Sequence, residues 1–325
     1  MQQFLFLSLI DACIPYFSTM KNSADYYEKE NECTEVLQSL GQCYHLWTPE
    51  NFEIIFTCDD EFRAGMNIIG ISALICSDIK ILTFVIMSNH IHITICGDEA
   101  AIIRLFNLIK GNLVRVFRAR TIDWDSFREK HRHLQDLNDV RNVIVYDNRN
   151  GYLVTPSCSP FTYPWGANRY YFNPDAERLA LSKAVPVTFR EKRKIMRSHI
   201  ADSISGLMMF DGYALPLSFC DVKSGERLFR SASNYFYRLG RSIESQKAIA
   251  GEIGESVFYT DDELFSIIKR MANERYNNES LGQLPPACKI DLAKAMRYDY
   301  NASVKQISRL TKLSQSTLAS LGIID

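Results

Sequence analysis

Apolar residues gather in short runs over the first half of the chain, and their spacing changes between the strand and helix periods. The stretch CYHLWTPENFEIIFTC (43–58) has strand composition, whereas EFRAGMNIIGISALICS (61–77) repeats apolar residues at helical spacing. Residues 80–87 and 91–96 are two apolar runs typical of strands. AAIIRLFNLIKGNLVRVFRAR (100–120) is helical again, with one apolar and one basic face. This order predicts an α+β fold in which helices cover an antiparallel sheet.

The second half of the chain is less regular. Residues 198–284 have helical character without a motif, and Pro285-Pro286 marks a boundary before the C-terminal tail. We therefore expect four parts, with an α-helical region at the C-terminal end. They are an N-terminal extension (1–40), a sheet domain (41–185), a helical region (186–284) and a tail (285–325).

Composition narrows the class of protein. A hydrophobic fraction of 46% and a charged fraction of 23% suit a globular domain with a sizeable core. No apolar run has the length of a membrane span, so we expect a cytoplasmic protein with no membrane partner. The nine cysteines include no C-x-x-C pair, which predicts reduced thiols rather than a disulfide framework.

Charge is distributed unevenly along the chain. Residues 1–100 hold 14 acidic and 4 basic residues, whereas residues 101–325 hold 24 acidic and 33 basic residues. A polyanionic partner would therefore meet the later part of the chain, although an ordinary solvated surface has the same composition.

The most distinctive local feature is a histidine pair in MSNHIHITI (87–95). Ser88-Asn89 favours a turn before the second strand. Residues two apart in a strand share a face, so His90 and His92 project together and Ile91 points to the opposite side. Such a pair can hold a divalent cation, and the alternative is two hydrogen-bonded histidines at the end of a sheet. The second pair, His131 and His133, lies in a charged run without strand character, and we expect it on the surface.

The sequence around this pair resembles a known family. VIMSNHIHIT (85–94) is similar to the histidine signature of the IS200-like, REP-associated single-tyrosine (Y1) transposases of the HUH endonuclease class. Ser88 stands where that family usually has proline. Tyr146-Asp-Asn-Arg-Asn150 resembles the Y-x-x-x-N motif of the family, with Gly151 in place of its proline. Tyr163-Pro-Trp-Gly also looks like a family motif, and the resemblance covers residues 43–172.

The resemblance implies a ferredoxin-like HUH domain with a DNA transposase activity. Tyr146 would be the nucleophile, and His90, His92 and Asn150 would hold Mg²⁺ or Mn²⁺. The enzyme would cleave and rejoin single-stranded or hairpin DNA through a 5′-phosphotyrosine intermediate. Members of the family act as monomers or homodimers, and the sequence does not choose between these states.

Two alternative functions were considered. The residues argue against a phosphoesterase but not against a non-catalytic DNA-binding protein. A histidine-triad phosphoesterase needs a third histidine where Thr94 stands, and a two-motif (2H) phosphoesterase needs a second H-x-[ST], which is missing. A domesticated, non-catalytic DNA-binding protein that keeps the fold is a different class, and the sequence does not exclude it.

A single-stranded DNA substrate calls for basic groups with aromatic platforms. The helix at 100–120 and the aromatic loop 161–172 supply candidates, although the loop is equally well explained as a lid that closes the core. The predicted contacts are Arg104, Lys110, Arg115, Arg118, Trp165 and Arg169.

The tail contains VKQISRLTKLSQSTLASL (304–321), which resembles a helix-turn-helix. Val304, Ile307 and Leu310 would bury one face of the first helix, and Leu313, Leu318 and Leu321 would bury the next. The recognition helix would start with four residues that reach base edges. These are Ser314, Gln315, Ser316 and Thr317. A plain helical hairpin is the alternative.

Overall fold

The computed structural model describes residues 23–49, 52–154, 161–196, 199, 202, 204–241, 261–278, 281–300 and 302–323. The chain folds into two compact units, residues 1–240 and 241–325. Unit 1 carries the sheet and the candidate site, and unit 2 is helical where it is described. Residues 186–240 thus belong with the sheet, whereas the helix that starts at Asp261 belongs with the tail.

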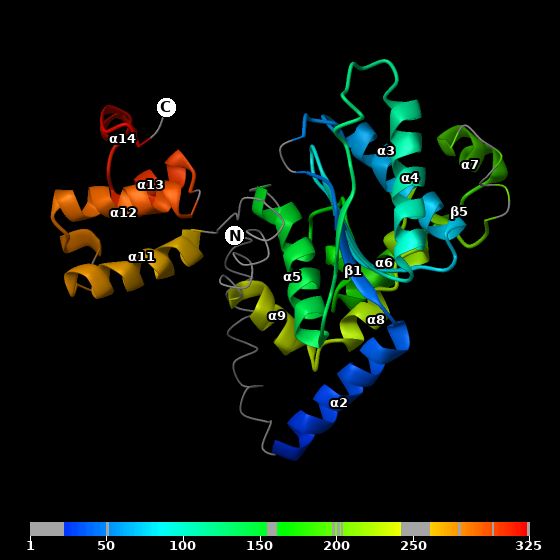
Figure 1. Cartoon of the computed structure of the whole chain (residues 1–325), viewed down its shortest axis with the longest axis horizontal. Coiled ribbons are helices and arrows are strands. Elements are labelled where there is room, and N and C mark those ends of the chain that lie inside the picture. The colour runs from blue at the N-terminus through cyan, green and yellow to red at the C-terminus, as the bar shows by residue number, and fades with distance from the viewer. Residues whose placement is uncertain are drawn as a thin grey trace. The chain divides into compact units, whose positions relative to one another are not determined.

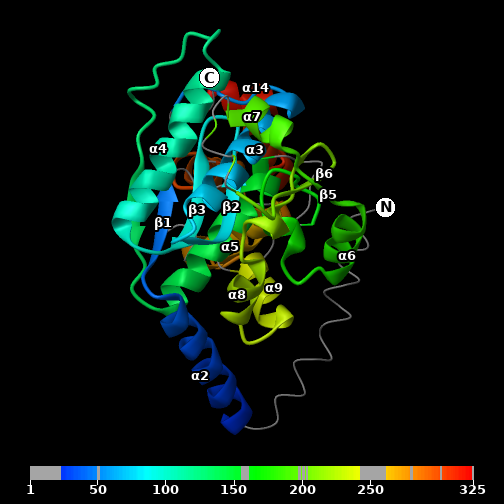
Figure 2. The same ribbon diagram turned by 90° about the vertical axis from the view of Figure 1, so that its right-hand side faces the viewer.

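A four-stranded antiparallel sheet forms the centre of unit 1. Its strands are β1 (Cys43–Trp47), β2 (Lys80–Ile86), β3 (Ile91–Cys96) and β4 (Lys130–His133), in the order β2-β3-β1-β4. Helix α3 (Asp59–Ile75) joins β1 to β2, and α4 (Glu99–Val116) joins β3 to β4. Figure 2 shows β1, β3 and β2 side by side in this order. The predicted α+β class with an antiparallel sheet is confirmed.

Helices cover both faces of this sheet. Helix α5 (Leu137–Val154) packs against β2 and β3, and Figure 1 shows it on the side of β1 opposite α3 and α4. Because both faces are covered, every residue of β1 and β3 is buried. Leu46 lies opposite Ile93 and points to one face, whereas His45 lies opposite Thr94 on the other. The α5 side of the sheet is therefore the polar one.

The two edges of the sheet are protected in different ways. At one edge, β4 is short and charged, which discourages pairing with another chain. The expectation that His131 and His133 lie outside a strand was wrong, because an edge strand needs no apolar alternation. At the other edge, the loop around Trp165 covers β2, since Ile86 N donates to Trp165 O at 2.8 Å.

The predicted strand over residues 43–58 is shorter in the structure. Strand β1 ends at Trp47, and the described residues after it form loop up to α3. Pro49 lacks an amide hydrogen and interrupts the ladder soon after Trp47.

Cys43 and Cys96 face each other across β1 and β3 and form a disulfide. The expectation of uniformly reduced thiols was wrong for this pair, because strand pairing brings together two cysteines that are 53 positions apart. Cys33, Cys58, Cys76, Cys220 and Cys288 are free thiols.

An ion pair anchors the first described helix, α2 (Ser23–Leu40), to the sheet layer. Arg141 of α5 is 1% exposed and donates to both carboxylate oxygens of Glu30, at 2.6 and 3.0 Å. These hydrogen bonds from Arg141 hold the pKa of Glu30 below its usual value. Arg141 also donates to Leu228 O, next to α8 (Val222–Arg227), so one side chain links three segments.

The remainder of unit 1 consists of small elements around the sheet. Helix α6 (Pro174–Lys183), α7 (Phe189–Met196) and α9 (Ala232–Arg241) accompany a second sheet of order β5-β6-β7. Its strands are β5 (Val185–Pro186), β6 (Met208–Phe210) and β7 (Tyr213–Ala214). Short 3-10 turns lie at η2 (Asn168–Tyr170) and η4 (Pro216–Ser218).

Unit 2 contains α11 (Asp261–Tyr276), η5 (Leu281–Gln283), α12 (Pro286–Tyr298), α13 (Val304–Thr311) and α14 (Gln315–Ser320). These helices share one apolar core that includes Leu292, Ile307 and Leu318. The tail prediction is right for Ile307 and Leu318, but Leu321 is 41% exposed. Leu321 follows the last turn of α14 as its C-cap and no longer follows the helical period.

No helix in the described part of the chain combines the length and apolar character that a membrane crossing requires.

Candidate functional site

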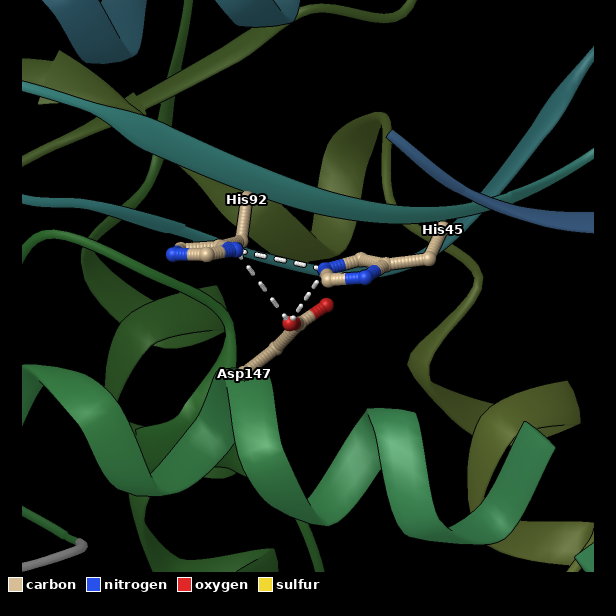
Figure 3. A group of neighbouring side chains, drawn as sticks. All are labelled: His45, His92 and Asp147. Carbon is tan, nitrogen blue, oxygen red and sulfur yellow. Dashed lines mark hydrogen bonds and ion pairs between the residues drawn. The ribbon is translucent and has the colours of Figure 1, made fainter. Parts of the chain in front are cut away.

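Two histidines and an aspartate meet between the sheet and α5. His45 comes from β1, His92 from β3 and Asp147 from α5, and Figure 3 shows the three side chains facing one another. His45 Nε2 lies 3.2 Å from His92 Nδ1 and 3.1 Å from Asp147 Oδ1. His92 Nδ1 lies 4.0 Å from the same carboxylate oxygen. All three side chains are fully buried.

Strand register explains this meeting. Trp47 lies opposite His92, and His45 lies opposite Thr94, so the two histidines are diagonal neighbours on one face. Their rings stack with centroids 5.3 Å apart. Asp147 reaches the two histidines from α5, which packs against β3, and its other oxygen accepts from Thr94 Oγ1 at 2.6 Å.

The three donor atoms fit a metal ion. Bonds from a metal to nitrogen or oxygen of about 2.0–2.2 Å place neighbouring donors roughly 3.0–3.6 Å apart. Two of the three separations lie in this range, and the third is 4.0 Å. A buried carboxylate also needs a compensating positive charge, and a cation between these donors would supply it. Thr94 would act as the outer partner that orients the carboxylate.

The same geometry has a metal-free reading. A proton on His45 Nε2 would be shared between Asp147 Oδ1 and the lone pair of His92 Nδ1. In that case the cluster would be a hydrogen-bonded support for α5. Metal analysis of the purified protein separates these two states.

Tyr146 lies against the same histidines. Its ring contacts His92 with centroids 5.6 Å apart and His45 at 6.2 Å, edge-on in both cases. It sits in the interior of an 18-residue helix and is 2% exposed. Two residues further along α5, Asn148 also holds the helix to the sheet, because its Oδ1 accepts from Thr83 Oγ1 of β2 at 2.5 Å. The predicted nucleophile and one predicted metal ligand are thus neighbours.

His90 and Asn150 flank this centre. The His90 ring lies 4.9 Å from that of His92, and its Nδ1 is 2.7 Å from Asn89 Oδ1. Asn150 lies one turn beyond Tyr146 on α5 and is 8% exposed. The three side chains whose donor atoms lie close together are His45, His92 and Asp147. Only His92 among them was predicted as a metal ligand from the sequence. The roles of His90 and Asn150 as metal ligands stay predictions.

Burial keeps His90 and His92 uncharged at neutral pH. It lowers the pKa of His90 to about 4, and it lowers the pKa of His92 well below its usual value. The charges of His90 and His45 would add to the shift at His92. Neutral imidazoles have a lone pair available for a metal or a proton.

The basic residues proposed to contact DNA lie on or just after α4. Arg104, Arg115 and Arg118 are exposed, and Lys110 is half-buried. Arg104 donates to Asp78 at 2.5 Å, and Arg115 donates to Asn112 at 2.7 Å. That these side chains contact DNA stays a prediction.

The aromatic loop behaves mainly as a lid. Trp165 is 8% exposed and stacks on Phe62 with centroids 5.1 Å apart. Tyr163 donates to Ile86 O at 2.6 Å, and Tyr171 donates to Leu82 O at 2.8 Å, so both hydroxyls bind the edge strand β2. Arg169 is half-buried and donates to the Tyr213 hydroxyl. This packing supports the core-closing interpretation and leaves little of Trp165 for a base.

In unit 2, Ser314 caps α14 by accepting from Thr317 N at 3.0 Å. Gln315 and Ser316 are exposed, and Thr317 is half-buried.

His45 and Asp147 are the site residues that sequence reasoning missed. The order of strands is not written in the local pattern, so nothing in CYHLW shows that β1 lies beside β3. Asp147 could have been suspected, because it adjoins Tyr146 and a charged residue on a buried helix face needs a partner.

Comparison with known proteins gives no match. No family model matches the chain, and no curated protein or solved structure is similar to it.

Proposed function

We propose that unit 1 is a metal-assisted single-strand DNA transesterase of the HUH type, which acts in transposition. The observation that carries this proposal is the packing of Tyr146 against His92 and His45, beside a donor group suited to a cation. The connectivity β1-α3-β2-β3-α4-β4 and the sheet order β2-β3-β1-β4 are those of a ferredoxin-like domain, which supports the resemblance seen in the sequence.

In the proposed reaction, the Tyr146 oxygen attacks a backbone phosphorus. A bond forms between this oxygen and phosphorus, the bond to the 3′ oxygen breaks, and the strand leaves with a free 3′-OH. The phosphotyrosine conserves the energy of the broken bond, so a later 3′-OH can rejoin the strand. A divalent cation, when bound, would neutralise charge that develops on the phosphate oxygens.

The residues of the chain have distinct tasks in this scheme. Tyr146 loses a proton on attack, and the departing 3′ oxygen takes up a proton to become the free 3′-OH, so the step balances. The imidazoles in contact with the Tyr146 ring are those of His92 and His45. Asp147, oriented by Thr94, would hold the cation together with these two rings. Two imidazoles and one carboxylate suit Mn²⁺ or another first-row metal better than Mg²⁺, which prefers oxygen ligands and water.

Covalent trapping tests the proposal directly. A pool of labelled single-stranded oligonucleotides with hairpins and randomised flanks would be incubated with the full chain and Mn²⁺, Mg²⁺ or EDTA. We expect a labelled band that withstands denaturing gel electrophoresis, depends on metal, and disappears in Tyr146→Phe. Tyr44→Phe is the matched control, because Tyr44 is also buried in this region but points to the other face of β1. An equal yield of adduct in Tyr146→Phe would refute the assignment.

One observation favours a second candidate function. Tyr146 is 2% exposed, and His45 and His92 are fully buried, so a phosphodiester must displace covering residues to reach them. A domesticated DNA-binding protein that keeps the fold needs no such opening. It would give DNA binding without any covalent adduct in the same assay.

A further inference from the structure

Unit 2 builds a compact three-helix arrangement from α12, α13 and α14. Leu292 and Met296 of α12, Ile307 of α13 and Leu318 of α14 are all buried in one core. Because each helix contributes to this core, the short α13 and α14 are held in a fixed relation to α12. A plain helical hairpin on the surface would not need this shared burial.

The link between α13 and α14 is tight and individually capped. Ser303 and Gln306 form a capping box at the start of α13. Lys312 adopts a left-handed conformation with φ of 61° and ends this helix, and Ser314 caps α14. Ser308 Oγ donates to Leu313 O at 2.7 Å across the turn. This local hydrogen bonding defines a helix-turn-helix rather than a flexible tail.

The charged side chains of this motif are all positive. Lys305, Arg309 and Lys312 are exposed, and residues 300–323 contain no acidic side chain. Lys305 and Arg309 are one turn apart and share a face of α13. Gln315 and Ser316, at the start of α14, are exposed hydrogen-bonding side chains. A phosphate backbone beside base edges complements this combination of groups.

We propose that α13 and α14 bind double-stranded DNA, with α14 in the major groove. Gln315 and Ser316 would contact base edges, for which glutamine pairing with adenine is a known geometry. Lys305 and Lys312 would contact phosphates and supply affinity that does not depend on sequence. This binding goes beyond the strand-joining activity proposed for unit 1, because its ligand is a duplex and its residues lie in the other unit.

Selection from a randomised double-stranded DNA pool by the full chain tests this proposal. We expect the wild-type protein to enrich one sequence motif. Gln315→Ala with Ser316→Ala should reduce the preference for that motif by about tenfold or more. Lys305→Ala with Lys312→Ala should weaken binding to the motif and to unrelated duplex alike, and should lower the slope of log affinity against log salt by about two.

The matched control is Lys269→Ala with Lys294→Ala, which removes two exposed lysines from α11 and α12. This control should bind like the wild type, and all variants should keep the wild-type unfolding temperature. The proposal is overturned if no motif is enriched, or if the control loses as much affinity as Lys305→Ala with Lys312→Ala. Adduct formation at Tyr146 is read separately, so its failure leaves this test intact.

Discussion

A carboxylate with no solvent exposure, Asp147, needs a positive partner inside the protein. Its described neighbours are His45, His92 and the Thr94 hydroxyl, and a hydroxyl cannot supply the charge. A cation bound between the three donors would supply this charge, whereas the proton-sharing arrangement gives Asp147 Oδ1 only a hydrogen-bond donor from His45 Nε2. These two states have different consequences for metal content.

Metal content follows from this choice. We expect purified wild-type protein to retain Mn²⁺ or Zn²⁺ in inductively coupled plasma mass spectrometry, and Asp147→Asn and His45→Ala to lose most of it, because each removes one of three donors. His131→Ala is the control, since His131 of β4 pairs with Glu99 of α4 and is outside the group. If the wild type and Asp147→Asn contained the same amount of metal, the three side chains would not be its ligands. The cluster would then be the hydrogen-bonded, proton-sharing arrangement.

The buried His90 also predicts how stability depends on pH in metal-free protein. Its pKa is about 4 in the folded state and about 6.5 when unfolded, so the unfolded chain binds the proton first as pH falls. The contribution of neutral His90 to the free energy of unfolding is therefore fully present above the unfolded pKa and is lost below it. Between pH 7 and pH 5 this loss lowers the free energy of unfolding by about 2 kcal/mol. Urea unfolding at both pH values should show a smaller decline in His90→Gln. An identical decline in that variant would show that His90 is not the group responsible.

At the scale of elements, α5 carries Tyr146, Asp147 and Asn150, and its fit against neighbouring segments sets the site. Gly151 lies where α5 meets the aromatic lid, and a Cβ there would lie 2.2 Å from the Tyr163 ring. A side chain at Gly151 would therefore fit only if the Tyr163 ring moved.

Gly151→Ala should consequently destabilise unit 1 by roughly 1–3 kcal/mol, because the clash exceeds the gain in helix propensity. Gly111→Ala on α4 is the matched control. A Cβ at Gly111 meets nothing within 4 Å, so this change should stabilise the protein by up to about 1 kcal/mol. Chemical denaturation measures both, and a stabilising Gly151→Ala would contradict the packing described here.

Elements that depend on their own sequence were predictable. The pattern gave β2 and β3 within one residue, because both are continuous apolar runs with a turn between them. Edge strand β4 escaped prediction, since pairing with β1 rather than its own apolar pattern makes it a strand. The donor group shows the same division. His92 was singled out from a sequence motif, whereas His45 required the order of the strands in the sheet. The role of Tyr146 stays a prediction, although its ring packs against His92.

At the scale of the whole molecule, the two units offer different chemistry. Unit 1 holds buried imidazoles, a carboxylate and a phenol, whereas α13 and α14 of unit 2 present exposed basic and amide groups. The two proposed activities therefore have separate residues and separate assays. In that scheme a duplex-binding unit would locate the ends of an element, and the sheet unit would join single strands there.

In the proposed reaction, Tyr146 forms the covalent bond to DNA. Mass spectrometry of proteolysed adduct, after nuclease trimming, identifies the modified peptide and residue directly. We expect a nucleotide 5′-phosphate on Tyr146 in the wild type, and loss of this species in EDTA. A nucleotide on another residue, or a stable complex with unmodified Tyr146 under conditions of strand cleavage, would contradict it.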